Sequence, residues 1–317
     1  MDVYNLDDVK SYSIDYDITP EDLSAINSHM KKCRRRYDKS FFHELLKNHP
    51  KALKKDAIIM NKYKLISKLG SGSNGKVWLV EKISDNTPLA LKFGNKLLLA
   101  EYTVLKDLID IKGVNKVVDE CGFDTLRNLY YLPLEKLESS LDMYYKSRNK
   151  TVSESSIKIF GSKLLKILRD IHNKNYIYRD LSFKNIMMDK EGYIHLIDFG
   201  LSFILDKEEC IKYSGTYMFS SSSALKGNVP NFWDDIESVF YILVHLYFGA
   251  KGVPWEYCFK TPRVYITDYI SFAKVRDDYL FEHGVLNKLP SYLSNFYKSI
   301  NREKKIDYDV LISHFNK

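Results

Sequence analysis

The sequence predicts an α+β protein with two lobes, a small β-rich lobe followed by a larger α-helical lobe. Short apolar runs broken by Gly, Asn and Pro are typical of strands joined by turns, and they occur at 63–69, 76–82 and 89–93. A helix is expected over 97–108. After about residue 139 apolar residues recur at helical spacing, as in Ile157, Phe160, Leu164, Leu168 and Ile171. Strands that come first and helices that follow predict segregated lobes.

The length of 317 residues fits one two-lobed catalytic unit of roughly 250 residues plus an extension. We expect an N-terminal extension over 1–60, acidic at first, then basic and partly helical. The catalytic domain is expected over 61–317, with its N-lobe at about 61–137 and its C-lobe at about 138–317.

The cysteines and the apolar runs indicate where the protein resides. The 4 cysteines lie far apart without a CxxC pair, which argues against a disulfide framework and a zinc site. The acidic N-terminus lacks the apolar stretch of a signal peptide. No apolar run approaches the roughly 18 residues of a membrane span. We therefore expect an intracellular, cytoplasmic monomer without a membrane span.

Basic residues gather between 31 and 55 and begin with the cluster Lys31–Arg36. One interpretation is a solvated helical face. The other is a nuclear-localisation or anion-binding patch, which would bind nucleic acid or another anionic partner. The net charge of +7 does not decide between them. Aromatic residues are sparse in this region, so we do not expect a nucleic-acid-binding domain.

A glycine-rich motif of the form G-x-G-x-x-G-x-V lies between two predicted strands and contains Gly70, Ser71, Gly72, Ser73, Asn74, Gly75 and Val77. Glycine lacks a Cβ, so the backbone can approach phosphate oxygens closely. A strand follows the glycines, whereas a dinucleotide-binding turn would be followed by a helix. The motif predicts a hairpin over phosphates; a purely structural hairpin is the alternative.

Lys92 ends the apolar run Leu89-Ala90-Leu91-Lys92. A lysine buried in a strand is costly without a partner, and Glu101 on the next predicted helix is the candidate. A fixed cation of this kind can hold the phosphates of ATP. The alternative is a surface lysine whose stem alone is buried.

The segment 176–200 carries the strongest pattern, with Asp180 five positions before Asn185 and then Asp198-Phe199-Gly200. Asp180 can accept the proton of an attacking hydroxyl. Asn185 and Asp198, which we expect on adjacent strands of a hairpin, offer the oxygen ligands that Mg²⁺ prefers.

These motifs, in this order, resemble the eukaryotic protein kinases from about Tyr63 onward. Four later segments are similar to the casein kinase I group: GTYMFSS at 215–221, WDDIES at 233–238, VPW at 253–255 and KIDYDVL at 305–311. The resemblance implies the bilobal protein-kinase fold. It also implies transfer of the γ-phosphoryl of Mg-ATP to Ser/Thr hydroxyls of protein substrates, with ATP and Mg²⁺ as cofactors.

The resemblance also implies residue roles. Gly70, Gly72 and Gly75 would cover the phosphates, Lys92 would pair with Glu101, and Asp180 would be the base. Asn185 and Asp198 would bind Mg²⁺. The remaining implied positions are Val77, Ala90 and Met187 around adenine, Leu134 and the hinge Glu135–Leu137 beside it, Leu105, Tyr178 and Phe199 as a stack, and Asp235 as an anchor of the catalytic loop.

Four departures from the family pattern stand out. Tyr178 replaces the usual His, and Ser182 stands where Ser/Thr kinases carry Lys. Lys184 stands where tyrosine kinases carry Arg, and we hypothesise that it supplies the missing cation. The stretch from Lys92 to Glu101 and the segment from Gly200 to Gly215 are shorter than usual.

These departures leave alternatives open. They are a pseudokinase that binds ATP without transfer, a tyrosine or dual-specificity kinase, a small-molecule kinase of the aminoglycoside type, and a protein that mainly binds nucleic acid through its N-terminal region.

Overall fold

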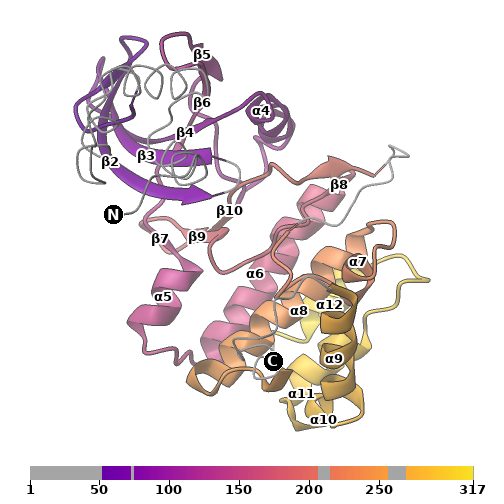
Figure 1. Cartoon of the computed structure of the whole chain (residues 1–317). Coiled ribbons are helices and arrows are strands. Elements are labelled where there is room, and N and C mark those ends of the chain that lie inside the picture. The colour runs from indigo at the N-terminus through magenta and orange to yellow at the C-terminus, as the bar shows by residue number, and fades with distance from the viewer. Residues whose placement is uncertain (1–51, 73–74, 206–214, 256–268, 317) are drawn as a thin grey trace, which may run out of the picture. The chain divides into compact units, whose positions relative to one another are not determined.

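The computed structural model describes residues 52–72, 75–205, 215–255 and 269–316 (Figure 1). Most of the expected extension, including Lys31–Arg36, lies outside these residues, as do Ser73 and Asn74. The chain forms two compact units. Of the described residues, unit 1 contains those up to Tyr102 together with Val117–Lys136, and unit 2 contains Thr103–Lys116 together with those from Leu137 onward.

Unit 1 is built on a six-stranded antiparallel sheet, drawn in indigo to purple in Figure 1, with the order β1-β2-β3-β4-β6-β5. The strands are β1 (Ile58–Ile59), β2 (Tyr63–Gly72), β3 (Gly75–Lys82), β4 (Pro88–Gly94), β5 (Gly122–Asp124) and β6 (Leu129–Glu135). One face buries an apolar core that includes Leu65, Val80, Leu91 and Phe93. The three predicted strand runs are thereby confirmed.

The hairpin between β2 and β3 depends on Gly75. Its φ is +128°, and a Cβ built on it would lie 1.9 Å from the carbonyl oxygen of Phe93 on β4. Only glycine tolerates both conditions, so Gly75 sets the path of β3 beside β4.

The helix α4 (Leu98–Asp107) follows β4, which confirms the helix expected over 97–108. Unit 2 begins within its length, at Thr103.

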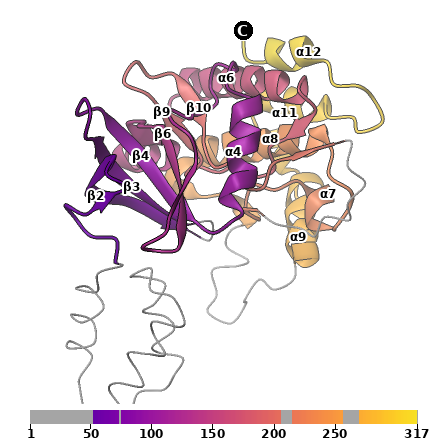
Figure 2. The same ribbon diagram turned by 90° about the horizontal axis from the view of Figure 1, so that it is seen from above.

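Unit 2 is mostly helical, as expected after residue 139. Its helices are α5 (Leu141–Ser147), α6 (Glu154–His172), α7 (Ser222–Leu225), α8 (Phe232–Phe248), α9 (Tyr269–Phe281), α10 (Val285–Lys288), α11 (Ser291–Lys298) and α12 (Tyr308–Ser313), with a 3-10 turn at Gly249–Lys251. The helix α6 packs against α8 and α12 (Figure 2). The predicted stripe of α6, from Ile157 to Ile171, is buried.

The start of helix α8 is determined by the capping residues Asn231 and Asp234. The Asn231 side chain accepts a backbone hydrogen bond from Trp233, and the Asp234 side chain accepts one from the backbone of Asn231, which together form a capping box. The negative charges of Asp234 and Asp235 in the first turn also interact favourably with the positive end of the helix dipole. This start fixes Asp235 in the interior of the unit.

Unit 2 also contains short strands. β7 (Ser139–Ser140), β9 (Ile186–Met188) and β10 (Ile194–Leu196) form a sheet with the order β10-β9-β7, and β8 (Tyr176–Ile177) pairs with β11 (Phe203–Ile204). Among these strands, the hairpin expected around Asn185 and Asp198 is present as β9 and β10, whereas β7, β8 and β11 were not predicted. β8 and β11 lie before and after the segment 178–198, and β9 and β10 lie within it. Among the described residues, no helix is both long enough and apolar enough to span a membrane.

Candidate active site

Unit 1 contributes a buried ion pair. Lys92 lies on β4, a central strand with β3 on one side and β6 on the other, and its Nζ lies 2.8 Å from Oε1 and 2.6 Å from Oε2 of Glu101 on α4. The two side chains are 6% and 2% exposed. Because a buried charge is stable only when it is paired, each residue fixes the position of the other.

The face of the sheet that carries Lys92 is opposite the apolar core. Side chains alternate along a strand, and Leu91 and Phe93 belong to the core, so Ala90 and Lys92 lie on the other face. Val77 pairs in register with Lys92, and Ala90 pairs with Leu134 of β6. The buried Oε2 of Glu135, at the end of β6, has no hydrogen-bond partner among the described residues.

Gly70 and Gly72 are exposed, with Ser71 between them. A Cβ built on either glycine would meet no atom within 4 Å. The described fold therefore does not require glycine at these two positions, in contrast to Gly75. Close approach of a ligand to the backbone is the remaining physical reason for glycine there.

Unit 2 contributes a carboxylate held by three donors. Oδ1 of Asp180 accepts hydrogen bonds from the backbone N of Thr216 at 3.0 Å and from its Oγ1 at 2.9 Å. Oδ2 accepts one from Nδ2 of Asn185 at 2.8 Å. Burial, and then the nearby charge of Asp198, raise the pKa of Asp180, while the hydrogen bonds from Thr216 and Asn185 oppose the rise.

Asn185 precedes β9 and Asp198 follows β10, so both lie at the open end of this antiparallel hairpin, where the backbone N of Ile197 donates to the carbonyl of Asn185 at 3.0 Å. Nδ2 of Asn185 is used by Asp180, so its Oδ1 is the atom that could accept a cation. Arg179 and Asp198 have φ of +72° and +58°. Such strained backbone in non-glycine residues is concentrated at functional sites.

Ser182 and Lys184 lie in the loop 178–185, which the resemblance marks as the catalytic loop, and they occupy different environments. Ser182 is 5% exposed, and its Oγ accepts a hydrogen bond from the backbone N of Asn185 at 3.2 Å, so it stabilises the loop from inside. Lys184 is exposed and forms no hydrogen bond or ion pair with the rest of the described chain. Met187 is half-buried on β9, and Leu137 is buried.

The backbone of the catalytic loop is anchored from α8. Oδ2 of Asp235 accepts a hydrogen bond from the N of Tyr178 at 2.7 Å, and Oδ1 accepts one from the N of Arg179 at 2.8 Å. The rings of Tyr178 and Phe199 pack edge to face with centroids 5.0 Å apart, and Leu105 is buried in the same unit. The hydroxyl of Tyr178 donates to the carbonyl of Ile197 at 2.5 Å.

Gly215 brings the segment before α7 close to the catalytic loop. Its φ is +130°, and a Cβ there would lie 3.0 Å from the carbonyl oxygen of Arg179. Glycine at this position therefore allows Thr216 to reach Asp180.

Comparison with known proteins gives the family. A model of the protein kinase domain matches residues 63–299. The chain belongs to the protein kinase family. Two relatives are a probable casein kinase I homolog of Encephalitozoon cuniculi, 28% identical over 208 residues, and RAC-beta serine/threonine-protein kinase A of Xenopus laevis, 26% identical over 191 residues.

These matches cover 61% of this kinase and 64% of the first relative, and 57% of this kinase and 38% of the second. The chain thus spans less than two thirds of the length of either relative. The predicted membership of the family and the α+β fold are confirmed, and the predicted likeness to casein kinase I agrees with the name of the first relative.

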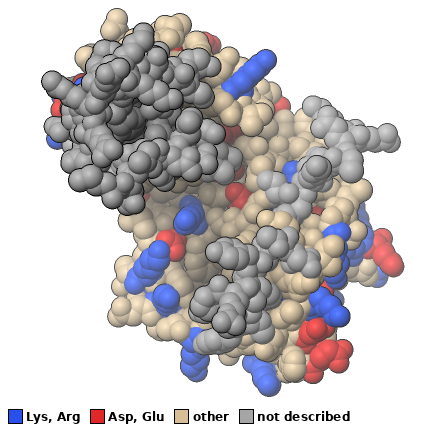
Figure 3. All heavy atoms as spheres, viewed as in Figure 1, with Lys and Arg blue, Asp and Glu red and all other residues tan. Residues whose placement is uncertain are grey.

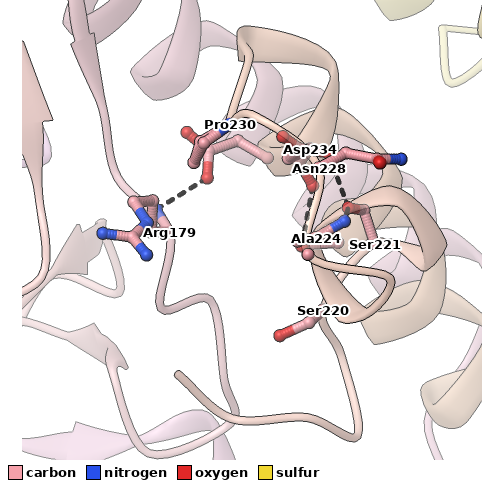
Figure 4. A pocket seen from close by; sticks show the side chains of 10 residues that line it. Arg179, Ser220, Ser221, Ala224, Asn228, Pro230 and Asp234 are labelled. Carbon is pink, nitrogen blue, oxygen red and sulfur yellow. Dashed lines mark hydrogen bonds between the residues drawn. The ribbon is translucent and has the colours of Figure 1, made fainter. Parts of the chain in front are cut away.

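A small pocket lies beside the catalytic loop of the kinase (Figure 4). Arg179 borders it on one side, and Ser221, Ala224 and Asp234 border it on the other. Neither Asp180 nor Asn185 lines this pocket. The hydroxyl of Ser221 donates to Asp234 at 2.6 Å and accepts from the N of Ala224. These two hydrogen bonds connect the start of α7 to α8.

Sequence reasoning missed three residues that contact this machinery. Thr216 bonds Asp180, His172 bonds Asp235, and Tyr308 bonds His172. The Gly215-Thr216 pair within the family-like segment was a signal for the first. Tyr308 lies within the family-like segment 305–311, whereas no local pattern marked His172.

The charge of the described surface is mixed. On the face shown in Figure 3, Lys and Arg prevail at the left side of the helical unit, whereas basic and acidic side chains alternate along its right side. On this face the described Lys and Arg side chains do not form one continuous basic patch.

Proposed function

We propose that this kinase transfers the γ-phosphoryl group of ATP to Ser or Thr hydroxyls of protein substrates. The observation that carries the proposal is Asp180, a buried carboxylate held by Thr216 and Asn185 near Asp198. Membership of the family supports the reaction class.

Asp180 is the proposed base. Its carboxylate orients the attacking hydroxyl and accepts its proton as the oxygen attacks phosphorus. The raised pKa of Asp180 makes it a stronger base than an exposed aspartate, which suits a proton transfer near neutral pH.

The residues also fit Mg-ATP. Oδ1 of Asn185 and the carboxylate of Asp198 are the hard oxygen ligands that Mg²⁺ takes, and they would hold it. When bound, the ion offsets negative charge on the phosphates. Lys92, fixed by Glu101, and the backbone of Gly70, Gly72 and Gly75 would hold the phosphates.

Binding of adenine is proposed for the apolar residues Val77, Ala90 and Met187. Val77 and Ala90 lie on the sheet face that also carries Lys92, and Met187 lies on β9. Glu135, Lys136 and Leu137 would form the hinge that contacts adenine.

Preference for Ser and Thr over Tyr rests on Thr216. Its backbone N and its hydroxyl both hold Oδ1 of the proposed base. The printed names of both relatives, a casein kinase I homolog and a serine/threonine-protein kinase, support the same preference. Lys184 is the proposed cation for the γ-phosphate, because the buried Ser182 offers no charge.

The test is transfer of labelled phosphate from Mg-ATP to casein and to the kinase itself, followed by phosphoamino-acid analysis. The variant Asp180→Asn should lack the transfer that wild type shows. The variant Asp110→Asn, the same change at an exposed residue of unit 2, should transfer phosphate as wild type does. Label on Ser or Thr supports the proposal, and label on Tyr overturns the specificity. ATP binding without transfer by wild type would identify a pseudokinase.

A further inference from the structure

The anchor of the catalytic loop extends from Asp235 to the C-terminal helix α12. Asp235 is 0% exposed, and Oδ2 accepts a hydrogen bond from Nε2 of His172 at 2.9 Å in addition to the backbone N of Tyr178. Nδ1 of His172 in turn contacts the hydroxyl of Tyr308. His172 ends α6 and Tyr308 begins α12, so three separate helices meet in one chain of hydrogen bonds.

The direction of each hydrogen bond follows from the carboxylate. An ionised Asp235 only accepts, so Nε2 of His172 carries a hydrogen and donates it. In the neutral imidazole Nδ1 is then an acceptor, and the hydroxyl of Tyr308 donates to it. The hydroxyl thereby favours the tautomer that keeps a third donor on Asp235.

Both neighbours of this chain are fixed by packing. The imidazole of His172 stacks on the ring of Phe232, with centroids 4.5 Å apart. Tyr308 is held by the start of α12, where the Asp307 side chain accepts a hydrogen bond from the N of Val310 at 3.1 Å. The hydroxyl of Tyr308 therefore has little freedom to reach any acceptor other than Nδ1.

The hydrogen bonds of Asp235 also fix the backbone of the two residues before Asp180. Asp235 bonds the backbone N of Tyr178 and of Arg179, the two residues before Asp180. Arg179 has a φ of +72°, a conformation that persists only when its surroundings hold it. A carboxylate that turns or moves would release this strained backbone.

We propose that Tyr308 is a positioning residue, which keeps the catalytic loop in place through His172 and Asp235. It touches neither substrate nor nucleotide in this scheme. The activity part of its test rests on the proposed kinase function, whereas the position of the loop can be measured without it.

The test compares Tyr308→Phe with Tyr292→Phe in the full chain. Tyr308→Phe keeps the ring and removes only the hydroxyl. Tyr292 is a matched control, because it is 7% exposed and its buried hydroxyl has no hydrogen-bond partner among the described residues. Amide hydrogen exchange at Tyr178 and Arg179 reports the anchor directly.

We expect amide exchange at Tyr178 and Arg179 to rise about three- to tenfold in Tyr308→Phe, the effect of weakening one hydrogen bond. The kcat for phosphate transfer should fall by a similar factor, with the KM for ATP equal to that of Tyr292→Phe and the Tm lowered only by the few degrees that the loss of one hydrogen bond costs. Exchange equal to wild type overturns the proposal. So does faster exchange throughout α6 and α8, which would indicate a purely structural role.

Activity of the wild type separates the two proposals. If wild type transfers no phosphate, the proposed function fails, and exchange at Tyr178 and Arg179 still decides the role of Tyr308.

Discussion

The side chain of Lys92 shows how strongly burial constrains a charged residue. Its partner Glu101 lies nine positions along the chain, and both side chains are almost fully removed from water. Removal of one partner leaves an uncompensated buried charge, which costs more than the pair itself contributes. The pair is thus required in the fold as long as either charge is present.

Glu101→Gln should therefore lower the free energy of unfolding by about 3 kcal/mol, whereas Glu120→Gln at an exposed position should change it by less than about 0.5 kcal/mol. The double change Lys92→Met with Glu101→Leu should recover most of the stability and none of the transfer. Urea unfolding measures both. A single variant as stable as wild type would show that the pair does not form in solution.

Lys184 is the residue whose role is least fixed by its surroundings. If it supplies the cation for the γ-phosphate, Lys184→Ala should lower kcat about 10- to 100-fold and leave ATP affinity within about twofold, because the contact is made mainly during transfer. Lys190→Ala removes an equally exposed lysine from the next turn and is the control. An unchanged kcat in Lys184→Ala would refute this role.

Thr216 sets part of the acidity of Asp180. Burial raises the pKa of Asp180, and the hydroxyl of Thr216 opposes that rise. Thr216→Val removes this donor, so the pKa should rise further. Because the base acts only when deprotonated, the acid limb of kcat/KM should then move to higher pH, by about half a unit or more. The exposed Thr151→Val is the control; a limb that stays in place or moves to lower pH contradicts the assignment.

At the scale of elements, the start of α8 joins three parts of unit 2. Nη1 of Arg302 lies 2.8 Å from Asp234 and Nη2 lies 2.7 Å from Glu237, both on the first turns of α8. The same two carboxylates accept hydrogen bonds from Ser221 and from the backbone N of Ser222, at the start of α7. One guanidinium therefore stabilises the helix start that also fixes the segment carrying Thr216.

Arg302→Ala should lower the free energy of unfolding by about 2 kcal/mol, a value reduced from that of a fully buried pair because Arg302 is 31% exposed. Arg302→Lys should recover only part of it, since an ammonium cannot bond both carboxylates as a fork. Lys304→Ala, a charge removal two residues away, should be near neutral. Equal stability of all three variants in urea would contradict the role of Arg302.

At the scale of the whole molecule, short motifs were enough to predict the fold class and the main candidates. Lys92, Asp180, Asn185 and Asp198 each belong to a run whose local spacing is set by a strand, a loop or a hairpin. The contact of Asp180 with Thr216 spans 36 positions, and that of His172 with Tyr308 spans 136. Such contacts depend on tertiary packing and leave no local periodicity.

The strands β7, β8 and β11 were not predicted, for a related reason. Each contains two residues, fewer than any alternating pattern needs, and each forms only because a partner strand lies beside it. Ser182 illustrates the opposite case, because its identity was noticed and its burial was not foreseen.

Binding of Mg-ATP should stabilise the folded kinase as a whole. A ligand that binds only the folded state adds about 2.7 kcal/mol at 100 times its Kd, which raises Tm by several degrees. The rise should be large with Mg-ATP, smaller with ATP alone, and reduced to the ATP-alone value in Asp198→Asn if that carboxylate holds the metal. Asp110→Asn, the exposed control, should keep the full rise. Equal shifts in Asp198→Asn and Asp110→Asn would remove Asp198 from the proposed magnesium site, whatever the activity of either variant.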